Sequence, residues 1–213
     1  MSKRKKSVLV LLFFGVAMWM FGCTSYERPN YKVIQTYDHF ELRHYPAHIV
    51  AETQVNASFD KAGNKAFRRL AGFISGANSK QQKIAMTAPV NQQASEGETI
   101  AMTAPVNQIN IAKDKYMIEF IMPQKYTMET IPQPTNPKVK IRQIPAKIMA
   151  VRKYKGSWSQ VKYNKNKEML LTNVQQAKLE ANGNPIFARY NSPFTIWFLR
   201  ENEVLVEIKN AAR

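Results

Sequence analysis

The strongest constraint on the fold is an internal repeat that relates the first half of the chain to the second. The segment FELRHYPAHIVAETQV at residues 40–55 aligns without gaps with VKIRQIPAKIMAVRKY at residues 139–154, a constant shift of 99 positions. Five of the sixteen positions are identical, and in the first copy they are Arg43, Pro46, Ala47, Ile49 and Ala51. Two copies of one unit around a shared core predict a domain with pseudo-twofold symmetry.

Each copy of the repeat leads into a predicted helix. After the first copy, Ser58 can cap the helix and Gly76 can end it, and apolar residues recur at the three-and-four spacing of a buried helical face. These residues are Phe59, Ala62, Ala66, Phe67, Leu70, Phe73 and Ile74. After the second copy, Ser157 can cap a helix that runs to about Leu179, with a less regular stripe of Trp158, Val161, Leu170, Val174 and Ala177.

Apolar runs bounded by turn residues predict the strands. The predicted strands are Ile84–Val90, Ile100–Val106, Tyr116–Met122, Ala188–Phe194, Thr195–Leu199 and Val204–Ile208. The phrase IAMTAPVNQ occurs at 84–92 and again at 100–108, which favours two adjacent antiparallel strands joined by a polar turn. The prolines between 123 and 137 indicate a loop. The predicted fold is α+β: two helices that flank a distorted, mainly antiparallel β-barrel with a pseudo-twofold repeat.

The N-terminus is typical of a secretory signal. Four basic residues within 1–6 precede fifteen uncharged, mostly apolar residues at 7–21, a run shorter than the roughly 20 residues that span a bilayer. Cys23, the only cysteine, follows Met20-Phe21-Gly22, and this ending is similar to the lipobox of bacterial lipoproteins. We therefore expect residues 1–23 to be a lipoprotein signal peptide, with diacylglycerol and an acyl chain such as palmitate attached at Cys23. An N-terminal membrane anchor that is never cut is the alternative.

The rest of the chain divides simply under this interpretation. Residues 24–36 are expected to be a tether, 37–208 the folded domain and 209–213 a polar tail, and the domain is long enough to bury one core. Thr24 stands where an aspartate would retain a lipoprotein at the inner membrane, so the expected location is the outer membrane, facing the periplasm.

The net charge of +16 falls to +12 when residues 1–23 and their four basic side chains are removed. An exported protein with this charge points away from nucleic acid and towards anionic lipid headgroups, lipopolysaccharide or an acidic small ligand. A soluble cationic surface with no specific partner is an equal alternative.

Several ordered motifs resemble those of the SOUL haem-binding protein family. They are FELRHYPAHIVAE, GFISGANSKQQKIAMTAPV, the stretch from IEFIMPQ to KYKGSW, and ARYNSPF followed by NEVLVEI, and together they cover roughly residues 37–208. The resemblance implies a distorted β-barrel with two flanking helices, an architecture shared with gyrase-inhibitor-like proteins. It also implies binding of haem or another tetrapyrrole in an exposed apolar groove, with no axial ligand common to all members.

The resemblance also suggests which residues contact the ligand. His44, within Glu41–Tyr45, matches the histidine proposed as iron ligand in some members, and neutral imidazole binds haem iron well. The alternative is an ordinary surface histidine. Arg68, Arg69 and Lys65 on the first helix are candidates to pair with the haem propionates. Tyr190 either lines the cleft or packs beside it.

Other polar and sulfur-containing residues carry weaker predictions. Met86 and Met102 are expected to fill the core rather than to ligate iron. His39 and His48 add little, since His44 and His48 would lie about 13 Å apart on a strand. No motif predicts structural zinc or calcium.

Enzyme motifs are missing from the sequence: there is no nucleophile elbow and no glycine-rich phosphate loop. We therefore expect a non-catalytic protein that binds a tetrapyrrole for transport, storage or scavenging. Two alternatives stay open. One is a small-molecule hydrolase with Glu119 as a buried base, and the other is a basic envelope protein that interacts with other molecules without a small ligand.

Overall fold

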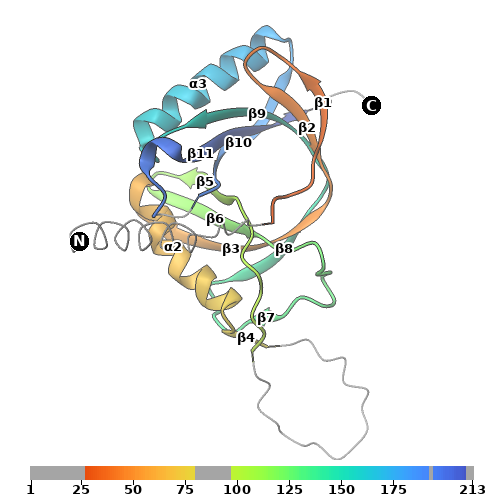
Figure 1. Cartoon of the computed structure of the whole chain (residues 1–213), viewed down its shortest axis with the longest axis vertical. Helices are drawn as coiled ribbons and strands as arrows, with labels where there is room; N and C mark the ends of the chain where they lie inside the picture. The colour runs from red at the N-terminus through yellow and green to blue at the C-terminus, as the bar shows by residue number, and fades with distance from the viewer. Residues whose placement is uncertain (1–26, 80–96, 192–193, 210–213) are drawn as a thin grey trace, which may run out of the picture.

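The computed structural model describes residues 27–79, 97–191 and 194–209 (Figure 1). In chain order the elements are β1 (Lys32–Thr36), β2 (Glu41–Tyr45), β3 (His48–Asn56), α2 (Phe59–Ile74), β4 (Asn78–Ser79), β5 (Val106–Ala112), β6 (Lys115–Ile121), β7 (Gln133–Pro134), β8 (Lys140–Ile144), β9 (Lys147–Lys155), α3 (Gln160–Gln176), β10 (Glu180–Arg189), η1 (Trp197–Leu199) and β11 (Glu201–Lys209).

The strand order of the main sheet confirms the internal repeat. The order is β1-β2-β9-β11-β10-β5-β6-β3-β8, and β8 and β9 lie 99 positions after β2 and β3. Glu41 pairs with Val151 between β2 and β9, and the equivalent pair, Lys140 with Glu52, joins β8 to β3. Apart from the edge strand β1, the order is therefore symmetric about the contact between β10 and β5.

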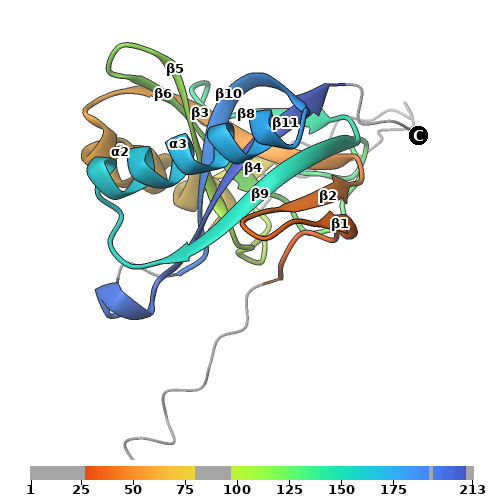
Figure 2. The same cartoon turned by 90° about the horizontal axis from the view of Figure 1, so that it is seen from above.

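The sheet curls into a half-barrel, and both helices lie on its outer side (Figures 1 and 2). Helix α2 packs on β3 and β6, whereas α3 packs on β9, β10 and β11. The two helices meet through stacked rings: the Phe59 ring centroid lies 5.0 Å from that of Tyr163 and 5.5 Å from that of Phe187. Aromatic contacts of this kind add to the stabilisation from burying the rings. The main core therefore lies between the sheet and its two helices.

The prediction for the first helix is confirmed. Ser58 is its N-cap, and Gly76, two residues beyond its last residue, has a φ of 111°, which glycine adopts without strain. Of the predicted apolar stripe, only Phe67 is not fully buried.

The second helix begins later than predicted. Its N-cap is Ser159 rather than Ser157, and the Ser159 side chain accepts a hydrogen bond from the Lys162 backbone N–H. The predicted placement of Val161 in the buried stripe was wrong, because its exposed fraction is 81%. Val161 precedes the buried Tyr163 by two residues, about 200° around a helix of 3.6 residues per turn, so the two side chains point to opposite sides.

The predicted strand Thr195–Leu199 was also wrong. Residues Trp197–Leu199 form a single 3₁₀ turn, and β11 instead pairs with β10 on one side and β9 on the other. With both edges of β11 occupied, no edge is left for residues 195–199. Strand β10 likewise ends at Arg189, earlier than the predicted strand Ala188–Phe194, whereas β6 agrees with the predicted Tyr116–Met122.

The repeated phrase IAMTAPVNQ is only partly described, because its first copy, with Met86, lies outside the described residues. The second copy is not the predicted strand, since β5 begins only at Val106. Thr99 and Thr103 form isolated bridges with Ser75 and Glu27. Pro105 has no backbone N–H to donate to a neighbouring strand. A side chain contacts β6 here: the Thr103 hydroxyl donates to the Ile121 carbonyl. Strand β1 lies within the segment expected as a tether, and Cys23 lies outside the described residues.

Two valines of α3 provide a matched test of this packing. Val174 is 1% exposed and contacts the main core. Val174→Ala should lower the free energy of unfolding by about 2 kcal/mol, because it removes buried methyl groups and leaves a cavity. Val161→Ala should change it by less than about 0.5 kcal/mol. Urea unfolding of both variants measures the difference, and equal losses would contradict the assigned helix orientation.

Candidate functional site

The inner face of the half-barrel, away from the helices, contains a hollow of about 230 Å³. Side chains from eight strands line it, and the apolar ones include Tyr45, Ile121, Met149, Ile186, Tyr190 and Leu205. A segment that we call the strap, residues 27–31, borders this hollow through Pro29. Pro29 of the strap also lines two other pockets, of about 410 and 420 Å³, so three compartments adjoin the strap.

Hydrogen bonds hold the strap in place. The Glu27 carbonyl accepts from the Ala104 N–H at 2.9 Å, and the Glu27 carboxylate accepts from the Gln124 N–H at 3.1 Å. The Arg28 guanidinium pairs with Glu201 at 2.9 Å. Since the Arg28–Glu201 pair is exposed, it contributes at most about 1 kcal/mol.

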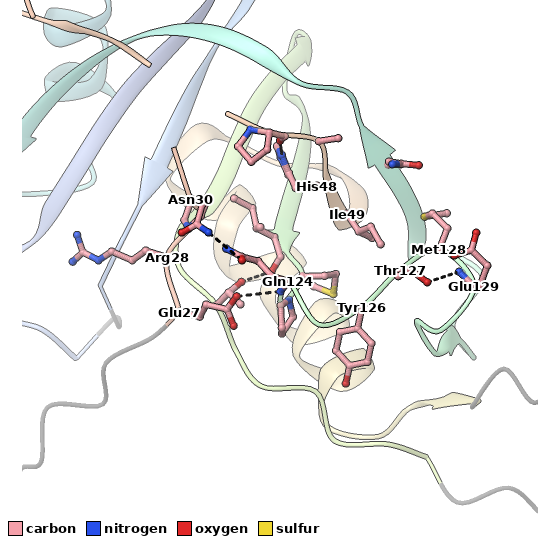
Figure 3. A pocket seen from close by; sticks show the side chains of 18 residues that line it. Glu27, Arg28, Asn30, His48, Ile49, Gln124, Tyr126, Thr127, Met128 and Glu129 are labelled. Atoms are coloured by element: carbon pink, nitrogen blue, oxygen red, sulfur yellow. Dashed lines mark hydrogen bonds between the residues drawn. The ribbon is translucent and has the colours of Figure 1, made fainter. Parts of the chain in front are cut away.

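Figure 3 shows the 410 Å³ pocket, with His48 beside it. The His48 Nδ1 lies 2.9 Å from the Pro46 carbonyl oxygen. A carbonyl only accepts, so Nδ1 carries the proton and the Nε2 of a neutral ring keeps a lone pair. Among the residues that line these three compartments, His48 is the one histidine, and it lines both the 410 Å³ pocket and the central hollow. The 410 Å³ pocket also contains the carboxylates of Glu27 and Glu129.

Arg43 occupies the centre of a buried polar network on the inner face. Its side chain is fully buried and donates to the Glu41 carboxylate at 2.7 Å, the Tyr45 hydroxyl at 3.0 Å and the Glu203 carboxylate at 3.0 Å. The Tyr190 hydroxyl donates to the second Glu203 oxygen at 2.5 Å. Burial and the Glu203 charge both raise the pKa of Tyr190, so its hydroxyl stays protonated.

Glu119 also lies on the inner face and lines the hollow. Burial raises the pKa of its carboxyl, although the Arg142 guanidinium, 2.9 Å away, opposes this shift. Arg142 also pairs with Glu52 at 2.8 Å. The carboxyl proposed as a base is therefore buried but already ion-paired.

Residues Phe194–Leu199, which we call the aromatic segment, form an exposed apolar surface. Phe194 is 95% exposed and Trp197 60% exposed, and Ile196, Phe198 and Leu199 are each more than half exposed. Figure 2 shows η1 projecting from one end of the molecule, beside the connection from β9 to α3. Such a run of exposed apolar side chains is unusual outside binding surfaces.

Arg200 joins the aromatic segment to the start of α3. Its Cζ lies 4.1 Å from the centre of the Trp158 ring, its Nε donates to the Thr195 carbonyl at 2.8 Å, and its own carbonyl accepts from the Gly156 N–H at 3.0 Å. The Lys162 side chain lies against Gly156: a Cβ there would be 2.1 Å from the Lys162 Nζ. Arg200 therefore lies next to the apolar surface, and Lys162 lies beside Gly156, whose N–H donates to the Arg200 carbonyl.

The residues predicted to bind a cofactor are not brought together. His44 lies on the solvent side of β2 and lines none of these pockets, whereas Tyr190 lines the central hollow. On α2, Arg68 is exposed, while Arg69 and Lys65 donate to the Gln54 and Asn56 carbonyls and line a separate pocket of about 450 Å³.

The remaining candidates have mainly structural surroundings. Met102 packs against the main core, and the carbonyl of the exposed His39 accepts from Arg152. Within residues 27–79, 97–191 and 194–209, no cluster of His, Cys, Asp or Glu side chains is suited to hold a metal ion. No helix in those ranges combines the length and apolarity needed to cross a bilayer.

Sequence reasoning missed the aromatic segment because its composition also suits a strand. One signal was present: Ile196, Trp197, Phe198 and Leu199 are consecutive and do not alternate with polar residues. A strand of a sheet with one wet face would alternate, so this run had to be either buried on both faces or exposed.

Comparisons with known proteins agree with the fold. A family model described as SOUL heme-binding protein matches residues 26–207. Heme-binding protein 2 of Mus musculus is 29% identical over 86% of this chain and 90% of its own length, and Heme-binding protein 2 of Homo sapiens is 30% identical over 80% and 78%. The crystal structure of the EcmrR C-terminal domain superposes with a TM-score of 0.55 at 11% identity, over 84% of this chain and 98% of that one, which shows a shared fold.

The Arg43 network predicts a specific loss of stability. Arg43→Met leaves the Glu203 carboxylate buried without its cation, so the free energy of unfolding should fall by about 3–5 kcal/mol at neutral pH. Lys153→Met, which removes an exposed partner of Glu41, should change it by less than about 1 kcal/mol. Denaturant unfolding compares the two. The double variant Arg43→Met/Glu203→Gln should recover part of the lost stability. If Arg43→Met alone were as stable as Lys153→Met, the network would not contribute to stability.

Proposed function

Because the chain belongs to the SOUL haem-binding protein family, we propose that it binds haem or a related tetrapyrrole without catalysing a reaction on it. The relatives named heme-binding protein 2, which match most of this chain, support the same ligand. Binding of this kind serves transport, storage or scavenging.

The observation that carries this proposal is the exposed apolar surface of the aromatic segment. Haem is a flat, largely apolar ring with two propionate groups at one edge. Phe194, Trp197 and Phe198 provide aromatic faces on which such a ring can stack. Arg200 stands beside them and, with Lys162 near Gly156, can pair with the propionates.

The compartments of the inner face suit haem less well. The central hollow of about 230 Å³ is smaller than the roughly 300–1,000 Å³ of most ligand pockets. The 410 Å³ pocket is larger, but the carboxylates of Glu27 and Glu129 would repel propionates. We therefore assign haem to the aromatic segment rather than to either of these two pockets.

This assignment places the iron beyond the reach of His44. His44 pairs with Ile148 in β9, and the aromatic segment lies near the opposite end of that strand, where Glu201 pairs with Lys155. Seven residues of strand span roughly 23 Å. Haem on the aromatic segment is then held by stacking and by ion pairs, without the predicted histidine ligand.

The second part of the proposal concerns the cell envelope. The basic residues 3–6, the apolar run and Cys23 support export and lipid attachment at the outer membrane, facing the periplasm. A lipid anchor would hold a haem-binding domain where haem crosses the envelope. The positive charge left after cleavage would favour contact with anionic lipid or lipopolysaccharide.

Cys23→Ser tests the lipid anchor. In cells fed radiolabelled palmitate, the parent protein should incorporate the label and sediment with membranes, and Cys23→Ser should do neither. Cys23 is the only cysteine, so the substitution removes no other thiol. Equal labelling of both proteins would exclude lipid attachment at this residue.

Haemin titration of residues 24–213, followed by the Soret band, tests the ligand and its site. Trp197→Ser/Phe198→Ser should weaken binding at least tenfold, because burying one large apolar side chain contributes about 1.5–3 kcal/mol and tenfold corresponds to about 1.4 kcal/mol. The matched control is Val33→Ser/Ile34→Ser, which removes two similarly exposed apolar side chains of β1. His44→Ala should leave the affinity unchanged.

Other outcomes identify the alternatives. Loss of the Soret shift in His48→Ala, with Trp197→Ser/Phe198→Ser unaffected, would move haem to the 410 Å³ pocket. Turnover of ester substrates that Glu119→Gln abolishes would favour a hydrolase. Binding to anionic vesicles without any haemin binding would favour an envelope protein that needs no ligand.

A further inference from the structure

Four buried side-chain atoms within the described residues have no hydrogen-bond partner, and all four lie in one place. They are the Tyr154 hydroxyl, Trp158 Nε1, Arg189 Nε and Asn202 Oδ1, which we call the orphan cluster. Tyr154, Asn202 and Arg189 are paired neighbours on the adjacent strands β9, β11 and β10. Buried polar atoms are nearly always paired, so four without partners in one cluster require an explanation.

Arg189 is the centre of the orphan cluster. It is only 9% exposed, and no carboxylate of the described residues forms a salt bridge with it. Within the described residues its side chain forms one hydrogen bond, from Nη2 to the neutral Gln108 Oε1 at 3.2 Å, and its Cζ lies 5.3 Å from the centre of the Trp158 ring. Burial lowers the pKa of Arg189 to about 10, so it remains charged at neutral pH.

Helix α2 approaches Arg189 closely. A Cβ at Gly63 would lie 1.9 Å from Nη2, so only glycine leaves room for the guanidinium at this position of the helix. A buried cation without an anion is strongly unfavourable. Gly63 nevertheless leaves space for the Arg189 guanidinium.

Helices α2 and α3 begin close to one another. The first turns of α2 and α3 meet, since the Gln160 N–H donates to the Asp60 carboxylate at 3.3 Å. The Asp60 carboxylate, in the first turn of α2, therefore already faces the positive ends of both helices. Beside Gly63, the three unpaired donors, one of which belongs to the buried cation Arg189, favour an anion with more than one acceptor oxygen.

We propose that the orphan cluster receives a carboxylate group of the bound ligand. This proposal rests on the proposed function and deepens it: the ligand is an amphiphile whose apolar ring lies on the aromatic segment and whose carboxylate enters beneath Trp158. One carboxylate offers acceptors to Arg189 Nε, the Tyr154 hydroxyl and Trp158 Nε1. The Asn202 Nδ2 donates to the Gly156 carbonyl at 2.9 Å, which fixes its Oδ1 as an acceptor, so the carboxylate contacts the other three groups and not Asn202.

The four orphan atoms are themselves buried, whereas other atoms of Tyr154 and Trp158 are part-exposed. A carboxylate therefore enters when these two side chains shift. Arg200, stacked on the Trp158 ring, also contacts the aromatic segment at Thr195. The ring and the carboxylate of one ligand can therefore occupy adjoining sites.

The test measures how tightly the full chain binds haemin and haemin dimethyl ester, whose propionates carry no charge. The parent protein should bind haemin at least tenfold more tightly than the ester. Tyr154→Phe, which removes one orphan oxygen, should weaken haemin binding several-fold and leave the ester unchanged. Without ligand the same variant should melt at a higher temperature, since it loses an unpaired buried hydroxyl.

Tyr163→Phe is the matched control. Tyr163 belongs to the same ring cluster, but its hydroxyl donates to the Pro185 carbonyl at 3.2 Å. This variant should melt at a lower temperature and keep the full preference for haemin over its ester. A haemin-to-ester ratio near one in the parent protein would overturn the proposal, as would a ratio that Tyr154→Phe does not change.

Sodium propionate alone provides a readout that does not need haem. At equal ionic strength it should raise the melting temperature of the parent protein above that in sodium chloride, and Tyr154→Phe should abolish the difference. No propionate effect would mean that water fills the cluster and would overturn the carboxylate site. If propionate stabilises the protein but neither haemin nor its ester binds, the carboxylate site stands and the tetrapyrrole assignment fails.

Discussion

The structure depends on an exchange of strands between the two copies of the repeat. β2 and β3 follow one another with only Pro46 and Ala47 between them, yet they do not pair with each other. β2 pairs with β9 of the second copy, and β3 pairs with β8, in equivalent registers. Because each copy completes its backbone hydrogen bonds only with the other, neither copy can form its part of the sheet alone. The curl of the sheet, the position of both helices outside it and the hollow inside it follow from this exchange.

The two buried arginines, Arg43 on the inner face of the sheet and Arg189 on its helix side, differ in their hydrogen-bond partners. On the inner face, Arg43 has acidic and phenolic partners for its guanidinium, and the network is complete. On the helix side, Arg189 has one neutral partner and three unpaired neighbours. A complete buried network stabilises one arrangement, whereas an incomplete one loses stability until something binds. This contrast separates a structural arginine from one that we assign to ligand binding.

Sequence reasoning predicted the fold, whereas the residues it proposed for the site stay predictions. The repeat, the α2 stripe and β6 were correct because they depend on local periodicity, which survives in a single sequence. His44 was proposed from a motif, but its strand position turns it to solvent, away from the pockets. His48 was not predicted to belong to the site, yet it lines a pocket because it directly follows the turn after β2. The aromatic segment was read as a strand because composition alone does not show that β11 already has two partners.

The sequence by itself determined the two-copy architecture, the helix that starts after Ser58, and the basic, apolar N-terminus ending at Cys23. These features arise from residues close together along the chain. Only the tertiary structure decided which strands pair, which apolar residues stay exposed and which arginine is buried without a carboxylate. Those outcomes depend on contacts between residues far apart in sequence, such as Arg43 with Glu203 and Tyr154 with Asn202, and local propensity carries no information about them.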